Sequence, residues 1–338
     1  MDDHPLLHAQ ASRGAEIGLW RGRTRALRYG PADYEALVSG HAVLDLLDRS
    51  ALIVRGDDRE TWLQGMVTAD LRSLGEGSGR PACFLEPKGH LLGDAWIARL
   101  PEALLVEVPA ACSDAIAAHC DRHLVMEDAE VEQARDTIVF LHVLGAQIEE
   151  IAGMRECALC VVSRPWCGRP GWWLAVPTQK AAQVWGSLVE SGLAPVGAEA
   201  AETARVEHGT PEYGTDMDTS TLPPEAGLHL SHISYEKGCY VGQEVMARLH
   251  ARGHTNRQLA GLILSGQGPA AAGERVMSSD GAADIGWTTS SVWSPRLTAW
   301  IALAYVRHEF RAPGTTVLIS GQRDATVSVL PFVPADRR

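Results

Sequence analysis

The sequence predicts an α+β fold, with two mixed domains built on mostly antiparallel sheets and a C-terminal all-β barrel. Strand-like and helix-like segments mix in two consecutive blocks, at residues 40–130 and 131–257. From residue 258 to 338, short strand-like segments alternate with Gly, Pro and Ser turns and no helical pattern is evident. Residues 1–39 carry five arginines and little periodicity. We expect them to form an N-terminal arm.

The elements of the first block follow from local signals. Asp57 is a suitable N-cap for a helix, and the Pro-Lys-Gly run at residues 87–89 predicts a hairpin turn. Apolar spacing at Ile116, Ala117 and Cys120 predicts a second helix. The expected strands are 42–47, 51–55, 82–85, 91–99 and 104–108, and the expected helices are 60–66 and 112–123.

A similar order follows in the second block. Its expected strands are 137–143, 158–162 and 172–176, and its expected helices are 147–152, 179–191 and 198–208. The C-terminal part is expected to contain strands at 259–264, 298–306, 316–319 and 326–330.

Composition limits the function classes. Hydrophobic residues make up 46% of the 338 residues and charged residues 21%, which is typical of a soluble globular protein and excludes a mainly disordered chain. The net charge of −12 argues against a nucleic-acid partner, and the apolar runs are too short to span a membrane. Seven cysteines, an odd number in a large chain, favour a reducing compartment. We therefore expect a cytoplasmic protein.

Glu207 is a candidate ligand-binding residue. It closes the helix expected at 198–208, where the helix dipole disfavours a carboxylate. One explanation is a salt bridge to Arg205 or another nearby cation. The other is recognition of a ligand, since a carboxylate accepts two parallel N–H bonds in a strong fork. The sequence leaves both explanations open.

Cys239 is a candidate for specific chemistry. It lies shortly before a helix that Gly242 could cap, and two residues after Lys237. A helix N-terminus and a nearby cation both stabilise a thiolate. The alternative is a buried structural cysteine, which is the commonest fate of an unpaired cysteine.

Cations gather in the stretch 237–257. Lys237, Arg248, Arg252 and Arg257 lie there with two histidines, and Glu244 is the only acid. This pattern fits either a solvated loop or a local anion site that would bind a carboxylate-bearing ligand.

Metal and nucleotide sites have little support. Cys157 and Cys160 with Cys167 lack a clean second pair, and His119 and His123 fit an ordinary helix surface. We predict no metal site. The chain contains no P-loop, no dinucleotide-binding glycine motif and no nucleophile elbow.

Residues 237–244, with the sequence K-G-C-Y-V-G-Q-E, resemble the signature of the YgfZ-type folate-binding proteins, a branch of the glycine-cleavage T-protein (aminomethyltransferase) superfamily. The resemblance covers most of the chain beyond residue 30. It includes residues 54–70, the hairpin at 88–94, the central block at 205–225, and 286–306 near the C-terminus.

This resemblance implies a three-domain ring around a central tetrahydrofolate channel, with 40–130 as the first folate-binding domain, 131–257 as the second domain and 258–338 as the barrel. Glu207 matches the acid that holds the pterin ring. The resemblance further implies cofactor-binding roles for Lys237, Tyr240, Gln243 and Arg248, and catalytic roles for Cys239 and Asp94.

The hairpin departs from the T-protein pattern, because Gly93-Asp94 stands where the family has two aspartates. Together with Cys239, this departure favours a tetrahydrofolate-binding accessory protein for iron–sulfur enzymes, whose partners would be folate and iron–sulfur client or assembly proteins. The first alternative is a folate-dependent aminomethyl or methyl transferase of the T-protein type, with Asp94 as acid or base. The second is a scaffold without folate that acts through protein contacts.

Overall fold

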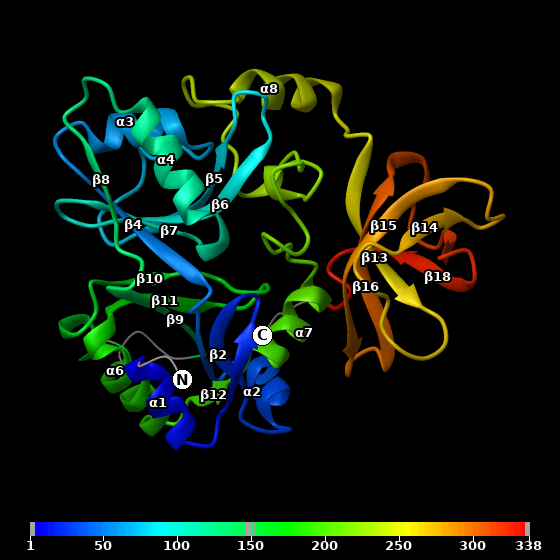
Figure 1. Cartoon of the computed structure of the whole chain (residues 1–338), viewed down its shortest axis with the longest axis horizontal. Coiled ribbons are helices and arrows are strands. Elements are labelled where there is room, and N and C mark those ends of the chain that lie inside the picture. Colours follow the sequence, from blue (N-terminus) through cyan, green and yellow to red (C-terminus); the bar gives the residue numbers. More distant parts are fainter. Residues whose placement is uncertain (1–3, 146–150, 152, 335–338) are drawn as a thin grey trace. The chain divides into compact units, whose positions relative to one another are not determined.

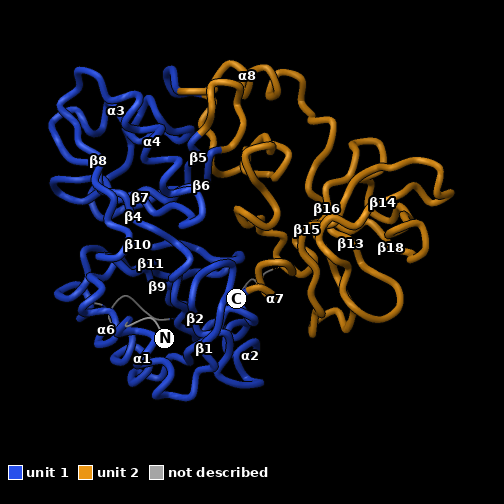
Figure 2. The backbone as a smooth tube through the Cα atoms, viewed as in Figure 1, with its two compact units in different colours: residues 1–84, 92–201, 236–240 blue, residues 85–91, 202–235, 241–338 orange. Residues whose placement is uncertain are grey.

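The computed structural model describes residues 4–145, 151 and 153–334. The chain forms two compact units (Figure 2). Unit 1 contains residues 1–84, 92–201 and 236–240, and unit 2 contains residues 85–91, 202–235 and 241–338. Apart from residue 151, the helix expected at 147–152 lies outside the described residues. No helix among the described residues is both long and apolar enough to cross a bilayer.

One five-stranded sheet comes from the first block (Figure 1). Its order is β5-β6-β7-β4-β8, and the strands are β4 (Arg49–Arg55), β5 (Gly79–Leu85), β6 (Leu91–Arg99), β7 (Leu104–Pro109) and β8 (Glu130–Gln133). The hairpin β5–β6 and the helices α3 (Arg59–Met66) and α4 (Ser113–His123) confirm the prediction of these elements, but the N-cap of α3 is Asp58 and not the expected Asp57. The short 3-10 helix η1 (Ala110–Cys112) leads into α4, which buries Ile116, Ala117 and Cys120 as their spacing predicts.

The second sheet combines strands from both blocks. Its order is β10-β11-β9-β3-β12, and its strands are β3 (Ala42–Asp45), β9 (Ile138–Leu144), β10 (Cys160–Ser163), β11 (Gly171–Pro177) and β12 (Ala194–Val196). Strand β3 pairs antiparallel with β9 and parallel with β12. Only three residues separate β3 from β4, so the chain passes directly from one sheet to the other. Helix α6 (Thr178–Glu190) and the 3-10 helix η2 (Gly153–Glu156) complete this region.

The prediction of an N-terminal arm is wrong. The segment forms helix α1 (Pro5–Ser12), the hairpin β1 (Glu16–Trp20) and β2 (Arg23–Arg28), and helix α2 (Asp33–Ser39). Leu6 is fully buried in the apolar core beside α6. Arg25 is also buried, and its guanidinium pairs with Asp45 at 2.9 Å and Asp48 at 2.9 Å. Arg25 is thus used inside the fold, because carboxylates in the next strand and turn neutralise it.

Unit 2 contains the closed six-stranded barrel β13-β16-β15-β14-β17-β18, which confirms the all-β prediction. The strands are β13 (Arg257–Leu264), β14 (Arg275–Ser278), β15 (Asp284–Ser294), β16 (Ala299–Arg307), β17 (Thr316–Ile319) and β18 (Arg323–Ser328). Small and branched apolar side chains such as Ala302, Ala304 and Val317 fill its interior.

Two helices next to the barrel in sequence or packing carry candidate site residues. Helix α7 (Ala198–His208) crosses from unit 1 into unit 2, and Val206 packs in a buried cluster with Leu259 and Leu303 of the barrel. Helix α8 (Gln243–Arg252) precedes the barrel. The remaining 3-10 helices are η3 (Leu228–Leu230) and η4 (His308–Phe310).

Candidate functional site

Lys237 anchors the signature segment inside unit 1. Its side chain is buried, and Nζ donates to the backbone oxygens of Gln64 at 2.5 Å, Val67 at 2.7 Å and Ala69 at 2.7 Å. An ammonium group has three N–H donors, so these three carbonyls use all of them. Burial lowers the pKa of Lys237 to about 7, while the three oxygens favour its charged form. Lys237 was expected to bind the cofactor, and here its donors bind backbone oxygens in the last turn of α3 and just after it.

Cys239 is presented at the surface two residues later. Three of the seven cysteines are buried, three are half-buried, and Cys239 is the exposed one. The alternative of a buried structural cysteine is therefore wrong for this position. Tyr240 is buried, and its ring centroid lies 5.1 Å from Lys237 Nζ. The buried pair Lys237 and Tyr240 thus brackets an accessible thiol.

Helix α8 begins where the sequence predicts. Gly242 has a φ of +82°, and a Cβ there would lie 2.8 Å from the Glu86 backbone oxygen, so a glycine is required. Gln243 is the first helical residue. Arg248 is exposed on the helix surface and pairs with Glu244 at 2.8 Å, one turn earlier. Gln243 and Arg248 belong to unit 2, whereas Lys237, Cys239 and Tyr240 belong to unit 1.

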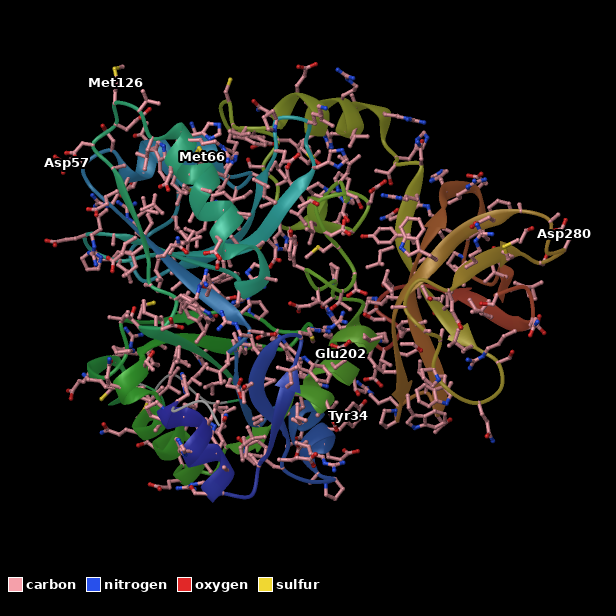
Figure 3. All side chains as sticks on the ribbon, viewed as in Figure 1. Tyr34, Asp57, Met66, Met126, Glu202 and Asp280 are labelled. Carbon is pink, nitrogen blue, oxygen red and sulfur yellow. The ribbon has the colours of Figure 1, made fainter. Side chains whose placement is uncertain are left out.

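Glu207 is buried at the end of α7, and Ser294 Oγ donates to its Oε1. The expected salt bridge with Arg205 is not formed. Arg205 instead pairs with Glu202 at 2.6 Å and Asp216 at 2.6 Å, and donates to Ser290 of β15. Figure 3 labels Glu202 on this helix.

Asp216 strengthens this arrangement. It also accepts hydrogen bonds from the hydroxyls of Thr289 and Ser290, so buried charges fasten the helix end to the barrel. The carboxylate of Glu207 is held in place without the guanidinium of Arg205. Arg205 is therefore not the cation that would explain the acid at this helix end.

Asp94 lies at one end of a buried charge network in unit 1. Arg49 Nη2 pairs with Asp94 Oδ2 at 2.8 Å, and Arg49 Nε pairs with Glu107 Oε1 at 2.9 Å. Glu107 is fully buried and also accepts hydrogen bonds from Arg164 at 2.8 Å and from Trp173 Nε1. Arg49 is itself fixed by Glu107, so it holds the Asp94 carboxylate in one orientation.

The sequence analysis did not predict this charge network. Its one visible signal is Glu107, an acid within the apolar strand at 104–108. Its partners Arg49 and Arg164 lie 58 and 57 residues away, and no local pattern connects them.

Gly93 and Asp94 face opposite sides of β6. A Cβ at Gly93 would lie 2.6 Å from Cys112 Sγ and 2.8 Å from Ile116 Cδ1, whereas Asp94 reaches Arg49. Burial, reinforced by the charge of Asp94, raises the pKa of Cys112 to about 12, so this thiol stays protonated. The side that faces Cys112 thus leaves no room for a second carboxylate at position 93.

The histidine and cysteine clusters do not assemble a site. Nδ1 of His123 hydrogen-bonds the backbone oxygen of His119, which is buried. Within residues 4–145, 151 and 153–334, no group of three or more His, Cys, Asp or Glu side chains could hold a metal ion.

Comparisons with known proteins match nearly the whole chain. The model of the GCVT N-terminal domain matches residues 6–158 and 148–233, and that of the glycine cleavage T-protein C-terminal barrel domain matches residues 257–334. An aminomethyltransferase of Rubrobacter xylanophilus is 29% identical over 97% of this chain and 93% of its own length. One of Synechococcus sp. strain CC9311 is 29% identical over 89% of each chain.

A solved structure supports the same fold. The glycine cleavage system aminomethyltransferase T of Bartonella henselae superposes with a TM-score of 0.85 at 23% identity, covering 98% of both chains. This match confirms the fold class that the resemblance implies.

Proposed function

Because the chain belongs to the glycine cleavage T-protein family, we propose that it binds a reduced folate and transfers a one-carbon group, as T-protein aminomethyltransferases do. The observation that carries this proposal is the orientation of Asp94 by Arg49. The curated relatives are named aminomethyltransferases, so they favour this function over the iron–sulfur accessory role.

Glu207 supplies the folate-recognition part of the proposal. Glu207 is buried, and its Oε1 accepts a hydrogen bond from Ser294 Oγ. The pterin ring presents an N–H and an exocyclic amine side by side, which suits a carboxylate fork. Tetrahydrofolate, when bound, supplies the nitrogens that carry the one-carbon group.

Asp94 supplies the acid–base part. Its side chain is 16% exposed although its Oδ1 is buried, and Arg49 directs the carboxylate through Oδ2. A carboxylate held in this way can accept a proton from an amine and return it. Cys112, which stays protonated, is not required for this step.

The test combines binding with turnover. We expect Glu207→Gln to weaken tetrahydrofolate binding by about tenfold or more in isothermal titration, because a charged acceptor is lost. Glu199→Gln changes an exposed acid of the same helix and should leave affinity unchanged. Asp94→Asn should retain binding but lose transfer from an aminomethylated carrier protein. Equal turnover of Asp94→Asn and wild type would exclude Asp94 as the acid–base group.

A second candidate function rests on Cys239, which is exposed beside a rigid anchor. In it, the folate-binding chain supports iron–sulfur enzymes through this thiol, as the signature at 237–244 implies. In cells that lack the chain, wild type should restore iron–sulfur enzyme activity and Cys239→Ser should not. The matched control is Cys160→Ser, at a half-buried position. Full rescue by Cys239→Ser would remove this role.

The tetrahydrofolate titration also tests the scaffold alternative. If no reduced folate binds at millimolar concentration, the chain acts without folate and both folate proposals fail. The cytoplasmic location stays a prediction.

A further inference from the structure

Unit 2 contains a cavity of about 680 Å³ beside the barrel. It lies where α8 ends and β13 begins, and it faces the adjoining ends of β15 and β16. This volume is within the usual range for small-molecule sites, about 300–1,000 Å³. None of the residues that we assign to folate recognition or acid–base chemistry lines it.

The lining is unusually basic for a protein with a net charge of −12. Its cationic or titratable members are Arg252, His254, Arg257, Arg307 and His308. The rings of His254 and His308 lie side by side, with centroids 4.7 Å apart. The cations expected at residues 237–257 thus continue, in space, onto the far end of β16.

Two of these arginines stand directly opposite one another. Arg257 of β13 pairs in register with Arg307 of β16. Like charges at opposed positions of an antiparallel pair are destabilising, so this pair needs a compensating anion. Glu225 compensates Arg257 through two contacts of 3.0 and 3.2 Å. Arg307 forms no ion pair with any residue that the structure describes.

The remaining charges leave the site positive. Arg252 donates to the side chain of Asn256 at 3.2 Å and has no acidic partner among the described residues. Of the two acids in the lining, Asp284 is paired with Arg275 at 3.2 Å, which leaves Glu309. Two guanidinium groups therefore face one carboxylate, and an incoming oxyanion would find N–H donors on both.

An apolar wall adjoins these donors. Trp287 is half-buried and the guanidinium of Arg257 lies over its ring at 4.7 Å. Tyr305 continues the same wall and is buried. Arg257 is thus fixed between Glu225 and the rings, while Arg252 and Arg307 have no acidic partner among the described residues.

We propose that this cavity binds a molecule carrying two or more oxyanionic groups, one on Arg307 and one on Arg252. Two sources have this chemistry: the carboxylates of a folate's glutamate chain, and the phosphates of a separate metabolite. The folate source rests on the proposed function, whereas the phosphate source is independent of it.

The test is isothermal titration of the full chain with two probes, γ-linked triglutamate and inorganic pyrophosphate. We expect at least one to bind with a dissociation constant below about 1 mM. Arg307→Ala and Arg252→Ala should each weaken that binding by about tenfold, because a charge-assisted fork is lost. Arg307→Lys, which keeps the charge without the fork, should lie between wild type and Arg307→Ala.

Arg296→Ala is the matched control, since this exposed arginine lies at the opposite end of β15 and β16. Preference for triglutamate assigns the folate chain, preference for pyrophosphate assigns a phosphate metabolite, and equal affinity leaves a general oxyanion site. The proposal is overturned if neither probe binds, or if Arg296→Ala weakens binding as much as Arg307→Ala. Neither probe contains a pterin. If neither probe binds, this cavity proposal fails, but the proposed function is still tested separately by the tetrahydrofolate titration of Glu207→Gln.

Discussion

The anchor formed by Lys237 gives a sharp stability prediction for Lys237→Met. Methionine has a similar length and fits a buried position, but it donates no hydrogen bond. The backbone oxygens of Gln64, Val67 and Ala69 would each lose a donor at 2.5–2.7 Å. Gln64 lies in the last turn of α3, and Val67 and Ala69 follow the helix, so no helical N–H is available to replace the lost donor.

The expected cost follows from these three contacts. Each unsatisfied buried acceptor costs about 1–3 kcal/mol, which gives about 3 kcal/mol at the low end of that range for three. Removal of a buried ammonium recovers part of its desolvation cost, so the low end is appropriate. We expect Lys237→Met to lower the free energy of unfolding by about 3 kcal/mol.

Urea denaturation at about pH 6 measures this value while Lys237 is charged, because its pKa is about 7. Lys180→Met is the control: it makes the same substitution at an exposed position of α6, where we expect a change within about 0.5 kcal/mol. A loss below about 1 kcal/mol for Lys237→Met would refute the anchor. It would mean that the three carbonyls find other donors or that water replaces the ammonium.

Three further predictions concern unit 1. Gly93→Asp should lower the melting temperature, because its Cβ would lie 2.6 Å from Cys112 Sγ; an unchanged melting curve would show that α4 can move away. Glu107→Gln should cost about 3–5 kcal/mol in urea denaturation, since it leaves Arg49 and Arg164 without their shared buried acid, and a neutral result would contradict the network. Burial lowers the pKa of His142 to about 3, so the unfolded chain binds more protons below about pH 6.5. Wild type should therefore lose up to about 1.4 kcal/mol per pH unit on acidification, and His142→Leu should flatten this slope; parallel slopes would exclude His142.

The sequence predicted an element correctly where the residues that specify it lie close together in the chain. The turn at residues 87–89, the apolar spacing of α4 and the Gly242 start of α8 each depend on residues close in sequence. Strand β15 escaped prediction because its centre is Thr-Thr-Ser-Ser, a composition typical of turns, and a register shift interrupts its pairing. Here Thr289 and Ser290 are buried because they donate to Asp216.

The same contrast between local signals and contacts distant in sequence applies to the candidate site. The sequence correctly placed Cys239 just before a helix N-terminus. It could not show that Lys237 is turned inward, because the three acceptors lie about 170 residues earlier in the chain. Arg25 was misassigned for the same reason, because its partner Asp45 lies 20 residues later in the chain and Asp48 lies in the turn after it.

The hairpin shows what changes structurally where the family pattern has two acids and this chain has one. Strand alternation sends neighbouring side chains to opposite faces, so positions 93 and 94 do not serve one surface. Position 93 faces Cys112 and Ile116, and glycine there lets α4 pack closely on the sheet. Position 94 faces Arg49, whose orientation is fixed by the fully buried Glu107. Loss of the acid at position 93 therefore changes packing against α4 but leaves the directed carboxylate of Asp94 intact. An acid–base role for this hairpin accordingly depends on whether Asp94 alone sustains transfer, which the Asp94→Asn turnover assay measures directly.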